Sequence, residues 1–376
     1  MPFRLSPESN IPSFRRTPES RRATCSLFFW IPAFAGMTKN GMIFSSESLR
    51  VHHWLPVLCL LIAPALLNGA ETAHRIPLLD DTRFQRGVVV HLPAPGKHVA
   101  AGTLTPFSEA EPLWNLVQWH SRFSLAGAQP ETIQPETTEE AAVRFFDGAK
   151  TITFYPKSGK GKPDLALGIN ALKEYDSGIP KPGDPWTHLL LERTLTGQPA
   201  LTEIKSVHFH LRFRIPKQEK KPTADWNENY HTAQFLFYMT VQNLNRNNPG
   251  YGDYYWYGVP MYDARYRHTP EHQAVDLSSD KKQGTGKFIF NLQGKEYFAE
   301  SAHDGEWITI DKDILPQIIQ GLESAWKRGY LPQSQNLSDY HLTGINIGWE
   351  VTGPMNVTAE IADFSIEMEP LKSNRL

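Results

Sequence analysis

The stretch SVHFHLRFRI, Ser206–Ile215, decides the fold class of this chain. Apolar and polar side chains alternate along it without a break. Alternation with a period of two residues is typical of a β-strand with one buried face. The residues on the face predicted to be buried are Val207, Phe209, Leu211, Phe213 and Ile215. The residues on the polar face are His208, His210, Arg212 and Arg214.

Other segments show the same alternation or a shorter version of it. The long ones are Thr187–Leu195, Gln234–Gln242 and Thr343–Val351. Shorter strands are predicted within Thr151–Tyr155, Asp164–Leu172, Lys287–Leu292, Trp307–Ile310 and Val357–Ile366. Gly, Pro and Asn cluster between them, as is typical of turns.

Helical spacing is rare in this chain. Asp313 is placed to cap a helix that ends near Gly329, and Ala141–Asp147 is expected to form a shorter one. Many strands and few helices predict an all-β fold, an antiparallel β-sandwich of jelly-roll type with one or two peripheral helices.

The first 70 residues are expected to lie outside this fold. The uncharged run WLPVLCLLIAPALL, residues 54–67, is shorter than the roughly 20 residues that a helix needs to cross a bilayer. It has the length of the apolar region of a signal peptide, and the small residues Asn68-Gly69-Ala70 follow it. We therefore expect a signal peptide over residues 42–70, an exported chain (periplasmic or extracellular), and a single β-sandwich domain over residues 71–376.

Residues 6–38 have neither helical nor strand periodicity and end in FWIPAFAGMT. This segment resembles the translation of an intergenic palindromic repeat found in some bacterial genomes. The resemblance implies a start codon assigned too early, with Met42 as the true start. Residues 1–41 would then be a disordered extension.

Cysteine content and charge exclude several kinds of site. Cys25 and Cys59 both precede residue 71, so the mature chain has no thiol for catalysis, disulfides or metal binding. Residues 71–376 hold 31 of the 38 Lys and Arg residues and 37 of the 40 Asp and Glu residues. This balance gives no electrostatic reason to expect nucleic acid as a partner. We expect no cofactor, and no stable membrane insertion of the mature chain.

Pairing of the predicted strands in one sheet would gather a polar face rich in His, Arg, Gln and Tyr. These side chains suit multidentate hydrogen bonding and proton transfer. The members of the face would be His188, Glu192, His208, His210, Arg212, Arg214, Gln234, Tyr238, Gln242, Asn346 and Glu350. The alternative is a solvated or loop-covered sheet surface without a ligand.

The segment Asn245–His268 is crowded with six tyrosines and one tryptophan. Flat rings beside glycine residues form a platform on which sugar rings can stack. Together with the polar face, it extends the predicted carbohydrate contacts to Asn243, Tyr254, Trp256, Asp263 and Arg265. The alternative is that the rings fill the core and the strand edges.

Three short motifs resemble those of concanavalin-like jelly-roll polysaccharide lyases of the alginate-lyase type. They are Leu190-Leu191-Glu192-Arg193, His208-Phe209-His210 and Tyr255-Trp256-Tyr257-Gly258-Val259. The resemblance implies elimination across a uronic acid, with His210 as base and Tyr255 as proton donor. It also implies Arg193 or Arg212 near the sugar carboxylate. The chain departs from the family at His208, where Gln is expected, at Tyr257, where Lys is expected, and in the Arg/Glu order.

Two other chemistries have candidate residues. Glycoside hydrolysis needs one protonated acid and one carboxylate that flank the bond. Glu192, Glu350, Asp263 and Asp304 are available for it, but the sequence fixes no separation between any two of them. A metal ion could be held by His208 and His210 with Glu192 or His231 as a third ligand.

The sequence therefore predicts an exported carbohydrate-interacting protein whose partner is a polysaccharide or oligosaccharide. The first hypothesis is a lyase acting on an acidic glycan. The alternatives are a non-catalytic carbohydrate-binding or cell-envelope protein and a glycoside hydrolase. The predicted catalytic residues are Glu192, His210, Arg212, Tyr255 and Tyr257. The predicted carbohydrate contacts are His188, His208, Gln234, Tyr238, Gln242, Asn243, Tyr254, Trp256, Asp263, Arg265, Asn346 and Glu350.

Overall fold

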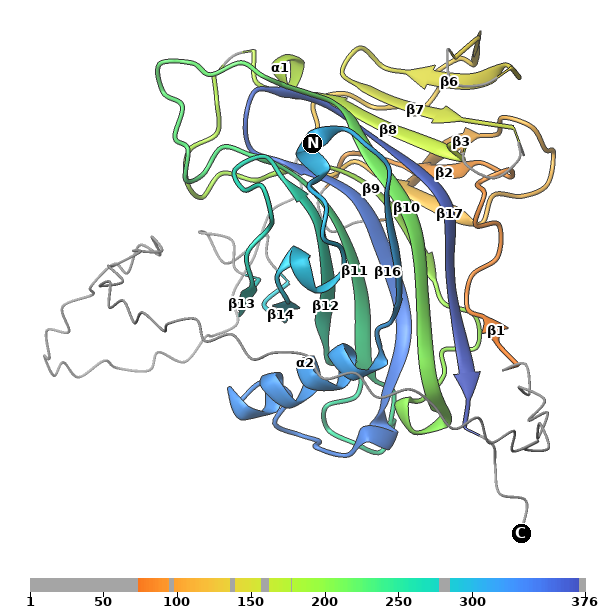
Figure 1. The fold of residues 1–376 in the computed structure, drawn as a ribbon, viewed down its shortest axis with the longest axis vertical. Coiled ribbons are helices and arrows are strands. Elements are labelled where there is room, and N and C mark those ends of the chain that lie inside the picture. The colour runs from red at the N-terminus through yellow and green to blue at the C-terminus, as the bar shows by residue number, and fades with distance from the viewer. Residues whose placement is uncertain are drawn as a thin grey trace, which may run out of the picture. The chain divides into compact units, whose positions relative to one another are not determined.

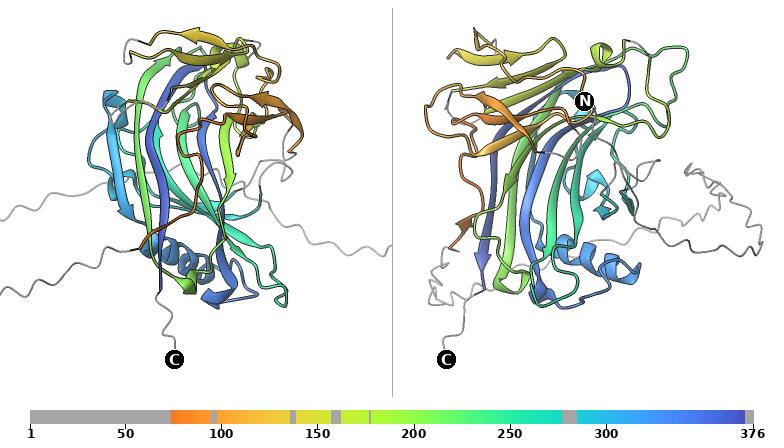
Figure 2. Two further views of the ribbon diagram at one scale, coloured as in Figure 1. Left: turned by 90° about the vertical axis from the view of Figure 1, so that its right-hand side faces the viewer. Right: turned by 180° about the vertical axis from the view of Figure 1, so that it is seen from behind.

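The chain folds into two β-sheets that pack face to face, an all-β sandwich of jelly-roll type (Figures 1 and 2). The computed structural model describes residues 74–94, 98–135, 139–156, 162–176, 178–276 and 285–371. The predicted extension 1–41 and the predicted signal peptide 42–70 lie outside these residues. Among the described residues, no helix has the length and apolar character needed to cross a membrane.

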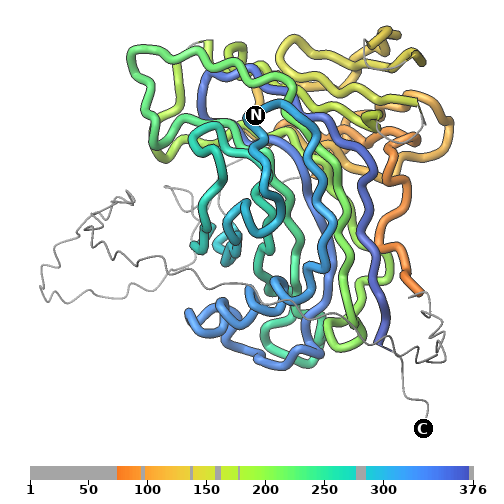
Figure 3. Tube along the Cα trace, in the orientation of Figure 1, coloured from red at the N-terminus to blue at the C-terminus, as the bar shows by residue number. Residues whose placement is uncertain are grey.

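The first sheet, called sheet A here, consists of antiparallel pairs. Its strands in order are β15 (Ile308–Asp313), β10 (Ile204–Lys220), β17 (Met355–Pro370), β8 (Leu165–Asn170), β7 (Lys150–Phe154), β6 (Ala142–Phe146) and β5 (Glu131–Ile133). β1 (Ile76–Pro77) also pairs with β17. The long strands β10 and β17 run side by side along this sheet (Figure 3).

The second sheet, called sheet B, has nine strands and is antiparallel except for the pairs β12/β14 and β2/β4. Its strands in order are β13 (His272–Val275), β14 (Phe288–Asn291), β12 (Tyr254–Asp263), β11 (Ala233–Asn243), β16 (Tyr340–Val351), β9 (Thr187–Thr194), β4 (Trp114–Val117), β2 (Val88–His91) and β3 (Ala100–Leu104). The fold class predicted from the alternating segments is therefore confirmed.

The core lies between the two sheets because each sheet has one apolar face. Phe209 on β10 and Phe237 on β11 meet across it with ring centroids 4.7 Å apart. Phe213 and Phe235 meet in the same way at 6.5 Å. Since these two strands belong to different sheets, their polar faces point in opposite directions. The expectation of one shared polar sheet face is wrong for this reason.

The helices are few, as predicted. α2 (Leu315–Lys327) begins beside Asp313, whose carboxylate accepts hydrogen bonds from the Leu315 and Val207 amides at 3.1 and 2.9 Å. Gly329 follows its last turn with a φ of 83°, in the left-handed region that favours glycine. The other α-helix, α1, spans Ala171–Glu174.

Two segments differ from what the sequence predicts. Ala141–Asp147 is not a helix: it contains β6, where Phe145 packs into the core and Phe146 points outward. Pairing on both sides, with β7 and β5, outweighs the local helical spacing. The segment Asn245–His268 contains a strand that the alternation does not predict, β12 at Tyr254–Asp263.

Candidate functional site

The outer face of sheet B carries most of the predicted polar residues in rows across adjacent strands. Gln234 on β11 lies opposite Glu350 on β16, which lies opposite His188 on β9. Asn346 lies four residues before Glu350 along β16. It lies opposite Tyr238 on β11 and opposite Glu192 on β9. Cross-strand pairing thus brings side chains from three strands together on one surface.

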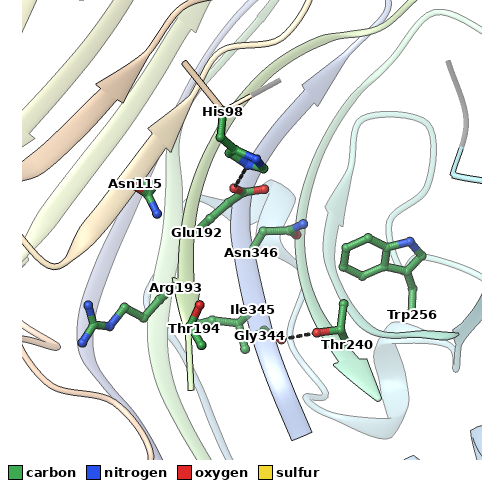
Figure 4. Close-up of a pocket in the computed structure, with 10 residues that line it drawn as sticks. All are labelled: His98, Asn115, Glu192, Arg193, Thr194, Thr240, Trp256, Gly344, Ile345 and Asn346. Atoms are coloured by element: carbon green, nitrogen blue, oxygen red, sulfur yellow. Dashed lines mark hydrogen bonds and ion pairs between the residues drawn. The ribbon is translucent and has the colours of Figure 1, made fainter. Parts of the chain in front are cut away.

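A hollow of about 330 Å³ opens on this face. The residues that line it are His98, Asn115, Glu192, Arg193, Thr194, Thr240, Trp256, Gly344, Ile345 and Asn346. Figure 4 shows Trp256 on one side, His98 and Glu192 on the other, and Asn346 between them. The Arg193 side chain points away from the hollow, toward the Leu113 carbonyl and Asp80.

Glu192 and His98 form one ionisable pair at this hollow. Glu192 Oε2 lies 2.7 Å from His98 Nε2 (Figure 4). Burial raises the pKa of Glu192, and the hydrogen bond and charge of His98 oppose that rise. The Glu192 side chain is only 18% exposed, whereas that of His98 is 52% exposed.

Glu350 and His188 form a second pair with unusual protonation. Burial raises the pKa of Glu350 to about 8, and the charge of Asp276 adds to the rise. Burial lowers the pKa of His188 to about 3, with a further contribution from His120. The two side chains approach to 3.7 Å. At neutral pH they are therefore a protonated carboxyl beside a neutral imidazole, not an ion pair.

The charge of Asp276 reaches Glu350, and the Asp276 carboxylate is held by hydrogen bonds. Its carboxylate accepts hydrogen bonds from the amide and the hydroxyl of Thr285 at 2.8 and 2.6 Å. The Thr285 hydroxyl also accepts a 3.2 Å hydrogen bond from the Trp256 indole. Burial raises the pKa of Tyr238, and the charges of Glu350 and Asp276 raise it further. The Tyr238 hydroxyl therefore lies in the field of both carboxyl groups.

Aromatic rings stand at two ends of this surface. Trp256 contacts Tyr238 and Tyr254 edge to face, with centroids 5.9 and 5.2 Å apart. At the other end, Trp119 contacts His98 and His188 at 5.9 and 5.8 Å. Such rings offer flat faces on which a sugar ring can stack.

Several buried polar atoms on or beside this surface have no hydrogen-bond partner among the described residues. They are His188 Nδ1, Asn346 Oδ1, Trp119 Nε1 and Asn291 Oδ1. Asn291 lies opposite Gly258, where an added Cβ would be 2.0 Å from its Oδ1. Buried polar atoms are normally satisfied, so a cluster of unsatisfied ones indicates a place for a polar ligand or water.

The polar residues of β10 lie on the other sheet and take no part in this surface. On the outer face of sheet A, Arg212 pairs with Asp363 at 3.2 Å and Arg214 pairs with Glu360 at 2.7 Å. His210 lies 3.8 Å from Asp311, and His208 lies 2.8 Å from an Arg75 nitrogen. The convergence predicted for His208, His210 and Arg212 with Gln234 and Glu192 is therefore wrong.

Tyr255 and Tyr257 point into the core instead of the surface. Both are fully buried, because Tyr254 and Trp256 take the outward positions of the alternating strand. The Tyr255 hydroxyl donates to the Ile318 carbonyl, and the Tyr257 hydroxyl lies 3.0 Å from that of Tyr297. Burial raises the pKa of both hydroxyls far above the ordinary value. The position predicted for these two catalytic residues is wrong.

Four other predicted contacts are occupied within the protein. Asp263 is buried, and its carboxylate binds Arg265 at 2.6 Å. Burial works to raise the pKa of Asp263, but the Arg265 guanidinium holds it below its usual value. Asn243 is 1% exposed and accepts from the Asn245 amide at 2.9 Å. Gln242 donates to the Gly252 carbonyl at 2.9 Å. These residues fix local structure around β11 and β12.

Outside the predicted contacts, the surface also contains His98, Asn115, Trp119, Thr194, Thr240 and Asp276. Thr194 and Thr240 lie on alternating strands, where their outward positions are readable from the sequence. The optional metal site of His208 and His210 finds no third ligand in Glu192, which lies on the other sheet, or in His231, whose ring nitrogens bind the Pro180 carbonyl and the Asn227 amide. In the described part of the chain, no group of three or more His, Cys, Asp or Glu side chains is arranged to hold a metal.

Comparison with solved structures returns carbohydrate-active enzymes. A family 12 xyloglucanase from Bacillus licheniformis is 9% identical, with a TM-score of 0.36, over 64% of this chain and 98% of that one. An engineered cellulase derived from Rhodothermus marinus is 11% identical, with a TM-score of 0.34, over 68% and 99%. A family 11 xylanase from Neocallimastix patriciarum is 9% identical, with a TM-score of 0.31, over 64% and 95%. Likeness at this level assigns no activity to this chain. No protein-family model and no curated protein sequence matches it.

Proposed function

We propose that the outer face of sheet B binds a polysaccharide chain and that the protein hydrolyses a glycosidic bond there. Glu350 is the proton donor. The observation that supports this most is the pKa of Glu350, about 8, in a surface that also holds a second carboxylate and two aromatic ends. A carboxyl group that stays protonated at neutral pH is what a glycosidase needs in its general acid.

The leaving sugar oxygen takes its proton from Glu350. The surroundings keep that proton in place, because His188 is neutral and cannot stabilise the carboxylate by charge. The second carboxylate is Asp276, whose charge acts on both Glu350 and Tyr238. We assign Asp276 the role of the second carboxylate, which acts on the developing positive charge of the sugar ring as base or as nucleophile.

Glu192 is a less suitable partner for Glu350. It lies opposite Asn346, four residues from Glu350 along β16. At about 3.3 Å per residue, the Cα atoms of those positions are about 13 Å apart along the strand. The two carboxyl groups reach the separation of a glycosidase, about 6.5–9.5 Å for inversion and less for retention, only if both side chains lean toward each other. Since the Glu192 carboxylate also forms a hydrogen bond with His98, we assign Glu192 to sugar binding.

The remaining groups suit a sugar chain. Trp256 and Trp119 offer stacking surfaces at two ends. Asn346 and His188 present unsatisfied buried atoms that can bind hydroxyl groups. A few convergent polar groups among aromatic side chains are typical of a small-molecule site.

The lyase hypothesis finds less support, because its residues do not converge. His210 and Arg212 lie on sheet A, and Tyr255 and Tyr257 lie in the core. A non-catalytic binding surface is the second candidate. The hydrogen bond of Glu192 to His98 favours it, since it leaves Asp276 alone to complete a catalytic pair.

The test is incubation of purified residues 71–376 with a panel of neutral and acidic polysaccharides. Reducing ends and the absorbance of unsaturated products are followed separately. Hydrolysis predicts new reducing ends without absorbance. A rise in the absorbance of unsaturated products from a uronate polymer would contradict hydrolysis and indicate elimination. Polysaccharide binding without either signal would contradict catalysis and support the non-catalytic binding surface.

We also propose that the mature protein works outside the cytoplasm. The apolar run at residues 54–67 and the small residues after it support export. The measurement is fractionation of cells that express the full chain, with the N-terminus of the exported form sequenced. A chain that stays in the cytoplasm with residues 42–70 intact would contradict export.

A further inference from the structure

A second hollow, of about 270 Å³, lies on the outer face of sheet A. Cross-strand pairs set its residues in one row. The successive members of the row are Phe146, Thr151, Gly168, Thr358 and Lys217. Five strands spaced by about 4.8 Å extend over about 19 Å, which leaves room for more than one sugar ring.

Gly168 creates the floor of this row. A Cβ at this position would lie 2.3 Å from the Thr151 hydroxyl oxygen and 3.2 Å from that of Thr358. The Thr151 hydroxyl therefore takes the place that a side chain at position 168 would need. The Gly168 backbone and the two threonine hydroxyl groups together form a flat polar floor in the middle of the sheet.

Phe146 stands at one end of the row with 54% of its surface exposed. It is outward because its neighbour Phe145 takes the core position in β6. An aromatic ring that lies beside hydroxyl, amide and ammonium groups can stack on the apolar face of a sugar ring. It is the largest apolar surface that lines this hollow.

Amide and cationic groups complete the hollow. Asn170 Oδ1 is buried and has no hydrogen-bond partner among the described residues. Asn356 donates to Glu219 at 3.0 Å, and Lys217 lies 3.9 Å from the same carboxylate. Arg144, also lining the hollow, pairs with Glu131 at 2.8 Å. These exposed ion pairs contribute little, so their groups can turn to a ligand at small cost.

We propose that this hollow is a second carbohydrate-binding site, for an oligosaccharide that stacks on Phe146 and binds Asn170, Asn356 and Lys217. It lies on the opposite sheet from the proposed catalytic surface and does not depend on it. A polysaccharide bound there keeps the protein attached to its polymer, while the outer face of sheet B remains free to bind and cleave. Among the described residues that line the hollow, none carries a carboxyl group, which suits binding without cleavage.

The test is calorimetric titration with neutral and with uronate oligosaccharides in the Trp256→Ala background, which weakens the surface on sheet B. We expect binding of one of these ligand types to remain, and to weaken at least tenfold in Phe146→Ala and in Lys217→Gln. Phe107→Ala removes a ring that is 40% exposed outside the row and is expected to leave binding unchanged.

The ligand type that binds shows whether the cations select acidic sugars. The proposal is overturned if neither oligosaccharide binds in the Trp256→Ala background. It is also overturned if Phe146→Ala, shown to be folded by thermal unfolding, binds like its parent. Failure of hydrolysis in the Proposed function would leave this comparison intact, because it measures binding only.

Discussion

Phe209 of β10 and Phe237 of β11 pack against each other across the core, with ring centroids 4.7 Å apart. This contact decides which polar residues can share a site. Each strand turns its apolar side toward the other, so their polar sides point away from each other. His208, His210, Arg212 and Arg214 are thereby separated from Gln234, Tyr238 and Glu350 by the thickness of the sandwich, about 10 Å between sheets plus the side chains.

The first prediction concerns this separation. His210→Ala and Arg212→Ala should leave hydrolysis and glycan binding on sheet B within about twofold of the parent. Arg212 stacks over Trp307 and pairs with Asp363, so its loss affects only the outer face of sheet A. Initial rates and titration with an oligosaccharide check this. A loss of rate above tenfold in a folded His210→Ala variant would restore the lyase hypothesis.

A second prediction follows from the buried tyrosines. Tyr257→Phe removes a hydroxyl that lies 3.0 Å from the Tyr297 hydroxyl inside the core. We expect a loss of about 1 kcal/mol in the free energy of unfolding, measured by urea denaturation. The rate per folded molecule should not change, since the ring never reaches the surface. A stable variant with a strongly reduced kcat would contradict this placement.

The third prediction concerns the aromatic end of the site. Trp256→Ala should raise KM or Kd for an oligosaccharide about tenfold, equivalent to about 1.4 kcal/mol. The matched control is Trp307→Ala, which removes an indole from sheet A where it stacks between Arg212 and Arg214. Equal effects of the two substitutions would show that Trp256 has no special contact with the glycan.

The fourth prediction concerns stability and pH. Glu350 has a pKa of about 8 in the folded protein, above its ordinary value of 4.5. The folded state therefore binds a proton that the unfolded chain releases, and this stabilisation, complete below pH 4.5, is lost as the pH rises through about 8. Position 350 does not titrate in the Glu350→Gln variant, so the stability of this variant relative to the parent should increase over this range by up to about 5 kcal/mol.

Urea denaturation of both proteins from pH 4 to pH 9 measures the difference. The increase should level off above the pKa that Glu350 has in the folded protein, because Glu350 is then ionised in both the folded and the unfolded protein. A difference that stays constant with pH would mean that Glu350 is ionised in the folded protein at neutral pH, and its role as proton donor would be lost.

The fold was predictable because long alternating segments have only one way to bury their apolar sides. β10, β11, β9 and β16 were all located from the period of two. β12 was missed because tyrosines occupy both its inward and its outward positions, which removes the contrast between the faces. β6 was taken for a helix because a short apolar segment fits either period.

The site was predictable only in part. Alternation identified the outward residues Glu192, Gln234, Asn346 and Glu350, but not the sheet to which each strand belongs. That assignment depends on long-range pairing, which a single strand does not encode. His98 and Asp276 come from segments between strands, and only the folded chain places them beside Glu192 and Glu350.

The most direct test of the central claim compares hydrolysis by residues 71–376 with hydrolysis by Glu350→Gln on the polysaccharide that yields the most reducing ends. With a general acid removed, kcat should fall by about 10²–10⁴-fold, while the Kd for a non-cleaved oligosaccharide stays within a few-fold. The parent rate should also fall as the pH rises through about 8, where Glu350 loses its proton. A Glu350→Gln variant that cleaves at the parent rate would contradict the account.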